Sequence, residues 1–148
     1  MVSREEVEGF LLQLDANGAS HTEVDPGFWI VKPGGELDLD VVVHHTPPVL
    51  LLRVDVMTLP TNDETANTLA RHLLDLNAND LVHGSYGTTG GTVVLTEALE
   101  LSHLDYEEFR AAFESMTVAL ASHLRELAAY RDPGTTGSWR AVPSREAR

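Results

Sequence analysis

The chain has 148 residues, of which 43% are hydrophobic and 22% charged, a composition typical of an ordinary globular protein. Its formal net charge of −13 opposes binding to DNA or RNA, because phosphates require a basic protein surface. It has no cysteine, which excludes disulfides and thiolate metal ligands, and no apolar run approaches the ~20 residues of a membrane span. Met1 leads directly into a charged segment rather than a signal peptide. We therefore expect a cytoplasmic protein with no nucleic-acid and no membrane partner.

The first segment predicts a short amphipathic helix. Ser3 and Glu6 have the spacing of a capping box, in which each side chain bonds the backbone of the other residue. Asn17-Gly18 is a typical helix exit. Between these signals, apolar residues recur at helical spacing, at Val7, Phe10, Leu11 and Leu14.

Three strands are predicted next. The first is the β-prone run 28–31, which lies between Pro26-Gly27 and Pro33-Gly34-Gly35. The second and third show apolar alternation and are separated by Pro47-Pro48. Their inward positions are Leu37, Leu39, Val41 and Val43, then Leu50, Leu52, Val54 and Val56. Short connections favour an antiparallel meander.

The run of Phe28, Trp29, Ile30 and Val31 cannot point all its side chains to one side of a strand. Two explanations remain open. Either helices cover both faces of the sheet near this strand, or part of the run forms an exposed apolar patch that binds a partner.

The second half of the chain predicts a helix, a hairpin and a longer helix. Thr61 and Glu64 suggest a capping box for a helix that ends at Asn77. A glycine-rich turn region, residues 84–91, then leads through Gly90-Gly91 into an alternating strand at 93–99. Asp105 and Glu108 begin the longest helix, which Pro133-Gly134 would end.

The predicted order is therefore α-β-β-β-α-β-β-α, an α+β fold with an antiparallel sheet and packed helices. We expect one domain over residues 1–131 and a flexible C-terminal tail over residues 132–148, where apolar residues are few.

No pattern for catalysis is present in the sequence. The seven histidines lack the helical pairing of metal ligands, and no lysine follows the glycines of 84–91 as a phosphate loop requires. No serine lies in a nucleophile motif. We expect no catalytic residues, no metal and no cofactor, and a small-molecule hydrolase is the least favoured class.

One local pattern resembles a known family. Leu76-Asn77 closes a helix and Gly84-Ser85-Tyr86 enters the following strand, as in the type III secretion chaperone-like fold of the Tir chaperones and YbjN-like proteins. The predicted order of elements matches that fold over roughly residues 3–131. A single lysine among many arginines and alanines suggests a bacterial source.

The resemblance implies a non-enzymatic homodimer that holds an extended segment of a client protein on apolar surface patches. It implies partner-binding residues in the first helix and first strands, namely Phe10, Leu14, Phe28, Trp29 and Ile30. It places the dimer interface on the second helix and the strand after it, at Leu69, Leu73, Leu76, Val82 and Tyr86. The alternative is a YbjN-like regulatory or sensory transduction module that acts through protein–protein contacts.

Overall fold

The computed structural model describes residues 1–133 of the chain. This part contains three α-helices, six strands and a short 3-10 helix. In chain order they are α1 (Arg4–Asp15), β1 (Ser20–Asp25), β2 (Phe28–Lys32), β3 (Val41–Thr46), β4 (Val49–Thr58), α2 (Asp63–Asn79), β5 (Ser85–Thr89), β6 (Thr92–Glu100), α3 (Tyr106–Leu127) and η1 (Ala128–Tyr130). The predicted α+β class with an antiparallel sheet is confirmed.

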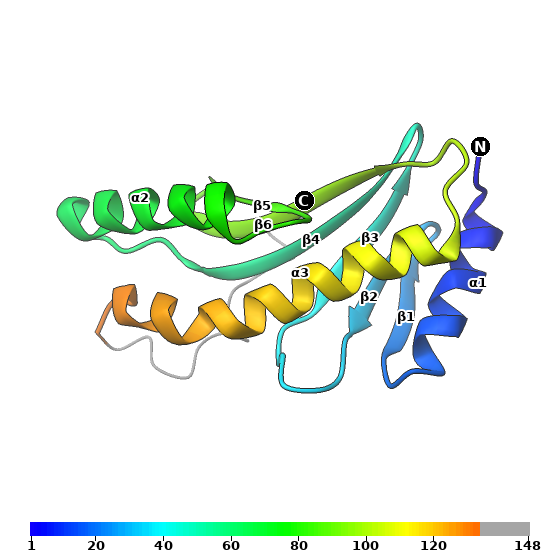
Figure 1. Ribbon diagram of the computed structural model, residues 1–148, viewed down its shortest axis with the longest axis horizontal. Helices are drawn as coiled ribbons and strands as arrows, with labels where there is room; N and C mark the ends of the chain where they lie inside the picture. Colours follow the sequence, from blue (N-terminus) through cyan, green and yellow to red (C-terminus); the bar gives the residue numbers. More distant parts are fainter. Residues whose placement is uncertain (134–148) are drawn as a thin grey trace.

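The six strands form one sheet in the order β1-β2-β3-β4-β6-β5, and every neighbouring pair is antiparallel. Hairpins join β1 to β4 in sequence and β5 to β6, whereas α2 lies between β4 and β5 in the chain. β1 and β5 are therefore the two edges of the sheet (Figure 1).

The prediction of three strands before the second helix is wrong, because the chain has four. The missing strand, β1, has five exposed residues among its six and lacks the apolar alternation that reveals a half-buried strand. The prediction that Leu37 and Leu39 lie in a strand is wrong, because both are buried in the loop before β3. The region 84–91 contains β5, and only Gly90-Gly91 forms the turn, with φ angles of 54° and 80°.

Capping side chains fix most of the helix starts. The capping boxes of Ser3 with Glu6 and Asp105 with Glu108 are confirmed. The box predicted at Thr61 is wrong, because Asn62 is the N-cap of α2 and accepts from the Thr65 amide. α2 extends two residues beyond Asn77, and α3 ends at Leu127 rather than at Pro133.

The predicted tail begins inside the described part of the chain and continues outside it. Asp132 accepts hydrogen bonds from the Thr61 amide at 3.1 and 3.3 Å, so the chain at this point is held beside the start of α2. Residues 134–148 of the predicted tail lie outside the described residues.

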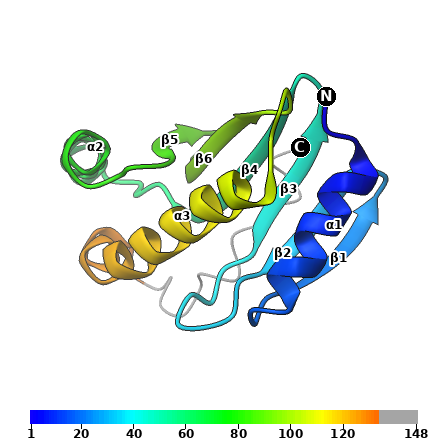
Figure 2. The same cartoon turned by 45° about the vertical axis from the view of Figure 1, so that its right-hand side comes forward.

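The two faces of the sheet differ in cover. α1 and α3 lie over the same face, which we call the covered face (Figure 2). Bonds from Trp29 to Glu8 of α1 and from Tyr86 to His123 of α3 place both helices there. Leu52, Val54 and Leu95 on this face are fully buried. α2 packs beside β5 and buries Leu69, Leu73 and Leu76.

We call the opposite side of the sheet the open face, since no helix among residues 1–133 covers it. Strand pairing places one set of apolar residues on it: Phe28, Ile30, Val42, Leu51, Val94 and Ala98. Val94 is buried, Ala98 is exposed, and the other four are half-buried. The alternative in which helices cover both faces near β2 is therefore wrong for the described chain.

Candidate partner-binding surfaces

The two predicted partner-binding residues of α1 belong mainly to the interior. The ring of Phe10 packs against Tyr106 and Phe109, with centroids 6.2 and 5.9 Å apart. Leu14 is buried, with 3% of its surface exposed. Phe10 is half-buried and keeps part of its surface at the exterior.

The β2 run divides between the two faces of the sheet. Trp29 points to the covered face, is 1% exposed, and donates its indole N–H to Glu8 Oε1 at 2.7 Å. Phe28 and Ile30 lie on the open face, where the ring of Phe28 packs against that of His44 with centroids 5.2 Å apart. Phe28 and Ile30 are therefore partly accessible on the open face, whereas Trp29 belongs to the core.

The edge strand β1 lies next to Phe28 and Ile30, since Thr22 pairs with Ile30 and Asp25 with Phe28. β1 is also among the most exposed segments of the described chain, and Val24 is 56% exposed. An exposed edge strand offers unpaired backbone groups that can bond a further extended chain.

A charged cluster links β1 to α1. Both ring nitrogens of His21 lie 2.7 Å from carboxylate oxygens, one of Glu8 and one of Asp15. Ionised carboxylates only accept hydrogen bonds, so both nitrogens donate and His21 is an imidazolium in this arrangement. Burial lowers the pKa of His21, but the hydrogen bonds and charges of both carboxylates outweigh it, and its pKa is raised above the ordinary value. The bond to His21 in turn lowers the pKa of Glu8.

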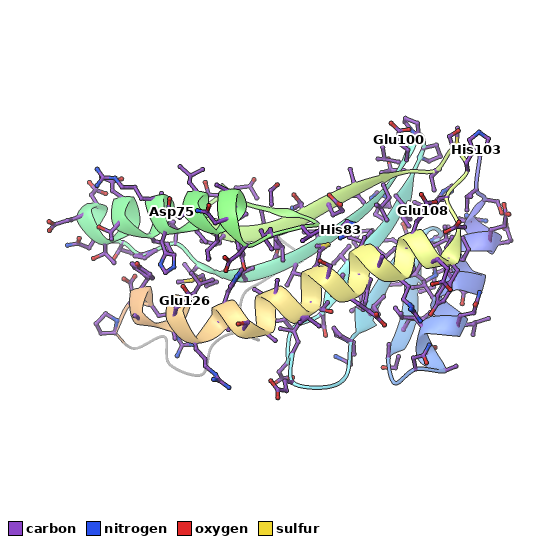
Figure 3. The ribbon with its side chains drawn as sticks, viewed as in Figure 1. Asp75, His83, Glu100, His103, Glu108 and Glu126 are labelled. Carbon is purple, nitrogen blue, oxygen red and sulfur yellow. The ribbon has the colours of Figure 1, made fainter. Side chains whose placement is uncertain are left out.

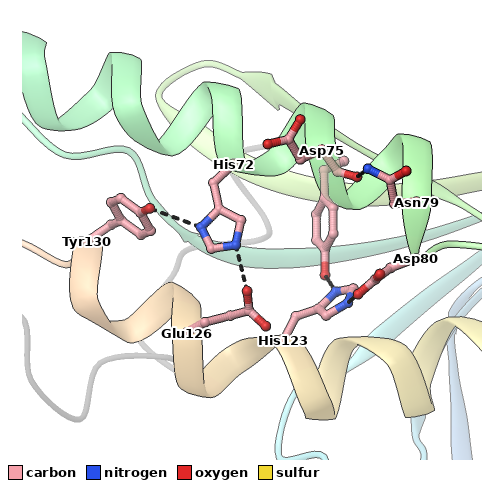
Figure 4. A network of polar contacts seen from close by, with 8 residues as sticks. His72, Asp75, Asn79, Asp80, His123, Glu126 and Tyr130 are labelled. Carbon is pink, nitrogen blue, oxygen red and sulfur yellow. Dashed lines mark hydrogen bonds and ion pairs between the residues drawn. The ribbon is translucent and has the colours of Figure 1, made fainter.

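A second polar network joins α2, β5 and α3 (Figure 4). His123, 3% exposed, contacts the Tyr86 hydroxyl at 2.7 Å through Nδ1 and Asp80 at 3.0 Å through Nε2. Burial, and then the charges of Glu126 and Asp80, raise the pKa of Tyr86, so its hydroxyl keeps its proton and forms a hydrogen bond with Nδ1 of His123. The carboxylate of Asp80 accepts a hydrogen bond from Nε2–H of His123.

The same network contains a second histidine nearer the end of α3. His72 of α2 contacts Glu126 at 2.6 Å and the Tyr130 hydroxyl at 2.9 Å. The two histidines thus connect α2 to the last turns of α3 at two levels.

Asn77 fixes β5 against α2 through the strand backbone. Its side-chain oxygen accepts from the Tyr86 amide at 2.7 Å, and its side-chain nitrogen donates to the Tyr86 carbonyl at 3.1 Å. One amide side chain therefore satisfies both backbone groups of an edge-strand residue.

The predicted dimer residues lie at two depths. Leu69, Leu73, Leu76 and Tyr86 are buried within the single chain, at 0 to 7% exposure. Val82, in the turn after α2, is 83% exposed, and Leu74 on the outer side of α2 is 65% exposed. Sequence reasoning missed Leu74, because it placed the interface on the apolar stripe of α2. That stripe is buried within the single chain, and Leu74 lies outside it.

A groove of about 610 Å³ lies between α3, the end of α1 and the loop between β2 and β3. Apolar side chains contribute much of its lining, and Glu36, Glu114 and Arg125 contribute charges. The apolar lining includes Leu14, Pro33, Leu37, Phe113, Val118 and Ala121. Sequence reasoning did not find this groove, because its walls come from three segments far apart in the chain.

Other titratable side chains are spread over the molecule. Figure 3 shows Glu100, His103 and Glu108 at the end where β6 passes into α3, and Asp75 and Glu126 toward the opposite end. Within residues 1–133, no group of three or more histidine and acidic side chains could hold a metal ion. None of the helices described is both long and apolar enough to cross a membrane.

Comparison with known proteins identifies the family. The CesT_Tir_1 family model matches residues 2–132, so the chain belongs to that family. This is the family of type III secretion chaperones that the resemblance in the sequence predicted. Its members are chaperones, which bind other proteins, rather than enzymes. No curated protein matches the chain significantly.

Solved structures share the fold. YbjN from E. coli, a proposed transcription regulator, aligns with a TM-score of 0.55 and 14% identity, covering 86% of this chain and 97% of its own. A chain of the HopA1–SchA chaperone–effector complex aligns with a TM-score of 0.54 and 13% identity, covering 94% of this chain and 96% of its own. A chain of the ExoU–SpcU heterodimeric complex, from the Pseudomonas aeruginosa type III secretion system, aligns with a TM-score of 0.56 and 14% identity. The alignment covers 86% of this chain and 98% of its own. Identities this low establish the similarity of fold alone.

Proposed function

We propose that this protein is a non-enzymatic cytoplasmic chaperone that holds an extended segment of a partner protein along β1 and the neighbouring open face. The observation that carries the proposal is the exposed edge strand β1 beside the half-buried Phe28 and Ile30. Family membership supports the general role of partner binding.

The proposed binding mode uses backbone and side chains together. An extended segment pairs with the outer edge of β1 through main-chain hydrogen bonds, which are independent of its sequence. Its alternate side chains lie on the open face beside Thr22, and long apolar ones extend across β1 toward Ile30 and Phe28. Phe10, Leu14 and Trp29 hold β2 and α1 rigid behind this surface.

We further propose that the protein is a homodimer, formed through the outer side of α2 and the turn that follows it. Leu74 and Val82 would be the contact residues, and the buried Leu69, Leu73, Leu76 and Tyr86 form the layer that supports them. Two exposed apolar side chains, one on α2 and one in the turn directly after it, favour burial in an interface.

Light scattering tests the dimer. We expect a mass near twice the 16.2 kDa of one chain at micromolar concentration. Leu74→Asp combined with Val82→Asp should give the single-chain mass, whereas Val24→Asp on β1 should not change it. A single-chain mass for the unaltered protein would overturn the dimer and leave partner binding untouched.

Affinity purification from the native cytoplasm tests the partner. We expect one stoichiometric exported protein to be retained by the unaltered protein and lost by Ile30→Glu. Thr89→Glu, exposed on the opposite edge strand, is the matched control and should retain the partner. Equal retention by the two variants would contradict the proposed surface.

The same purification distinguishes the alternative function. A YbjN-like regulatory module would retain regulatory or signalling proteins instead of an exported one. The similarity of fold to YbjN is the observation that keeps this alternative open.

A further inference from the structure

The groove beside α3 has a defined shape that the proposed client surface does not use. Its α3 wall runs from Phe113 to Arg125, a distance of roughly 18 Å at 1.5 Å per residue. An extended chain of about five residues has that length.

The opposite wall is held in place by close backbone packing. A side chain at Gly34 would lie 2.5 Å from the carbonyl oxygen of Gly18, and Gly34 has φ of +81°. Only glycine can therefore bring the loop this close to the end of α1. Asn17, at the same end of the groove, bonds the Gln13 carbonyl at 3.2 Å. The groove is thus formed before any partner binds.

The floor and rim favour one kind of occupant. Val118 is 70% exposed beside the buried Phe113, so an apolar side chain bound here would remove apolar surface from water. The charged residues that line the groove are two carboxylates, Glu36 and Glu114, and one guanidinium, that of Arg125. Glu114 has only a 3.8 Å contact with Arg110, at half-exposed positions, where such pairs are weak. With a net charge of −13 on the chain, the local and overall fields both favour basic residues.

The groove is also continuous with the proposed client surface. Ala19 lines the groove and directly precedes Ser20, the first residue of β1. A segment that pairs along β1 therefore lies next to the groove where it passes the Ser20 end of the strand.

We propose that the groove between α3, α1 and the β2–β3 loop binds a short extended stretch of the same partner, with apolar side chains flanked by lysine or arginine. This inference rests on the proposed function and deepens it, since it names a second contact and its chemistry. The apolar side chains lie over Val118 and Ala121, and the basic residues lie opposite Glu36 and Glu114.

The test is a titration of the full-length, ¹⁵N-labelled protein with two synthetic peptides, followed by amide NMR shifts. The probes are acetyl-Lys-Leu-Leu-Phe-Leu-Lys-amide and its counterpart with glutamate in place of lysine. We expect the basic peptide to shift the amides of Gly34, Gly35 and Val118 with a Kd of about 0.1–1 mM. The acidic peptide should bind at least about fivefold more weakly, and salt should reduce the difference.

Two pairs of variants localise the effect. Ala121→Trp fills the groove and should weaken the basic peptide at least about tenfold, while Ala111→Trp, exposed on the same helix, should not. Glu114→Gln should reduce the preference for the basic peptide, while Glu107→Gln, outside the groove, should keep it. Circular dichroism melts check that each variant is folded.

Each other outcome overturns the groove site. Shifts confined to β1 would retain the proposed client surface and reject the groove, and equal binding of both peptides would reject the charge preference. No shift with either peptide also rejects the groove, while partner purification still tests the proposed function separately. If Trp139→Ala shifts the groove amides without peptide, the occupant is the chain's own C-terminal segment.

Discussion

The two edges of the sheet are held in different ways. At β5, the Asn77 side chain bonds both the amide and the carbonyl of Tyr86, so backbone groups of the edge strand are satisfied from within the chain. At β1, the contact with α1 runs through the His21 side chain, and five of six strand residues are exposed. The comparison shows that Tyr86 in β5 is bonded from within the chain, whereas β1 is the more exposed edge, which is the edge that we propose for strand addition.

The largest expected effect is at the protected edge. Asn77→Ala removes two hydrogen bonds to the backbone and leaves the Tyr86 amide without its acceptor, which should lower the free energy of unfolding by about 2 kcal/mol. Asn79→Ala, which loses one exposed bond to the Asp75 carbonyl, should cost less than about 0.5 kcal/mol. Urea denaturation measures both. Equal losses would show that Asn77 does not secure β5.

A smaller effect on the free energy of unfolding is expected from the side chain of Tyr86. Tyr86→Phe removes the hydroxyl that is hydrogen-bonded to His123 and should lower the free energy of unfolding by about 1 kcal/mol. Tyr130→Phe makes the matching change at the half-buried His72 and should cost less. The comparison fails if Tyr130→Phe is the more damaging substitution in the same urea measurement.

The smallest expected effect on stability is at β1, and it depends on pH. The pKa of His21 is raised on folding, so its contribution is complete below the ordinary value of about 6.5 and is lost as the pH rises through the folded pKa. The lowered pKa of Glu8 makes its contribution present above about pH 4.3 and lost as the pH falls. The cluster should therefore stabilise most between about pH 4.5 and 6.5.

Thermal melts of His21→Gln at several pH values measure this contribution. The variant should be less stable than the unaltered protein at pH 6 by up to about 1 kcal/mol, with the difference shrinking at pH 8. Thr22→Val, exposed on the same strand and without a titratable group, is the control and should leave the pH profile unchanged. A difference that grows toward pH 8 would contradict the assignment of His21 as an imidazolium.

Local signals explain why most of the fold could be predicted from the sequence. The capping boxes at Ser3 and Asp105 act within one helical turn, and Gly90-Gly91 specifies its hairpin by allowing positive φ. β1 could not be found in this way. It is a polar edge strand whose pairing with β2, not its own pattern, makes it a strand.

The candidate surfaces were less predictable, because they depend on which side chains meet across the fold. The sequence shows that the β2 run must divide between two faces but does not say which way, and the structure places Trp29 inside and Ile30 outside. Glu8 meets Trp29 across 21 positions of sequence and His21 across 13. No periodicity connects residues so far apart.

The hydrogen bond between the Trp29 indole and Glu8 gives the protein a built-in optical reporter. Trp29 and Trp139 are the only tryptophans, so Trp139→Phe leaves a single emitter whose indole N–H touches a carboxylate bonded to His21. The ring is almost fully enclosed, and its emission should therefore be insensitive to aqueous quenchers. A change in the charge of the neighbouring cluster should still alter its wavelength or intensity, which would make the attachment of β1 to α1 visible without any label.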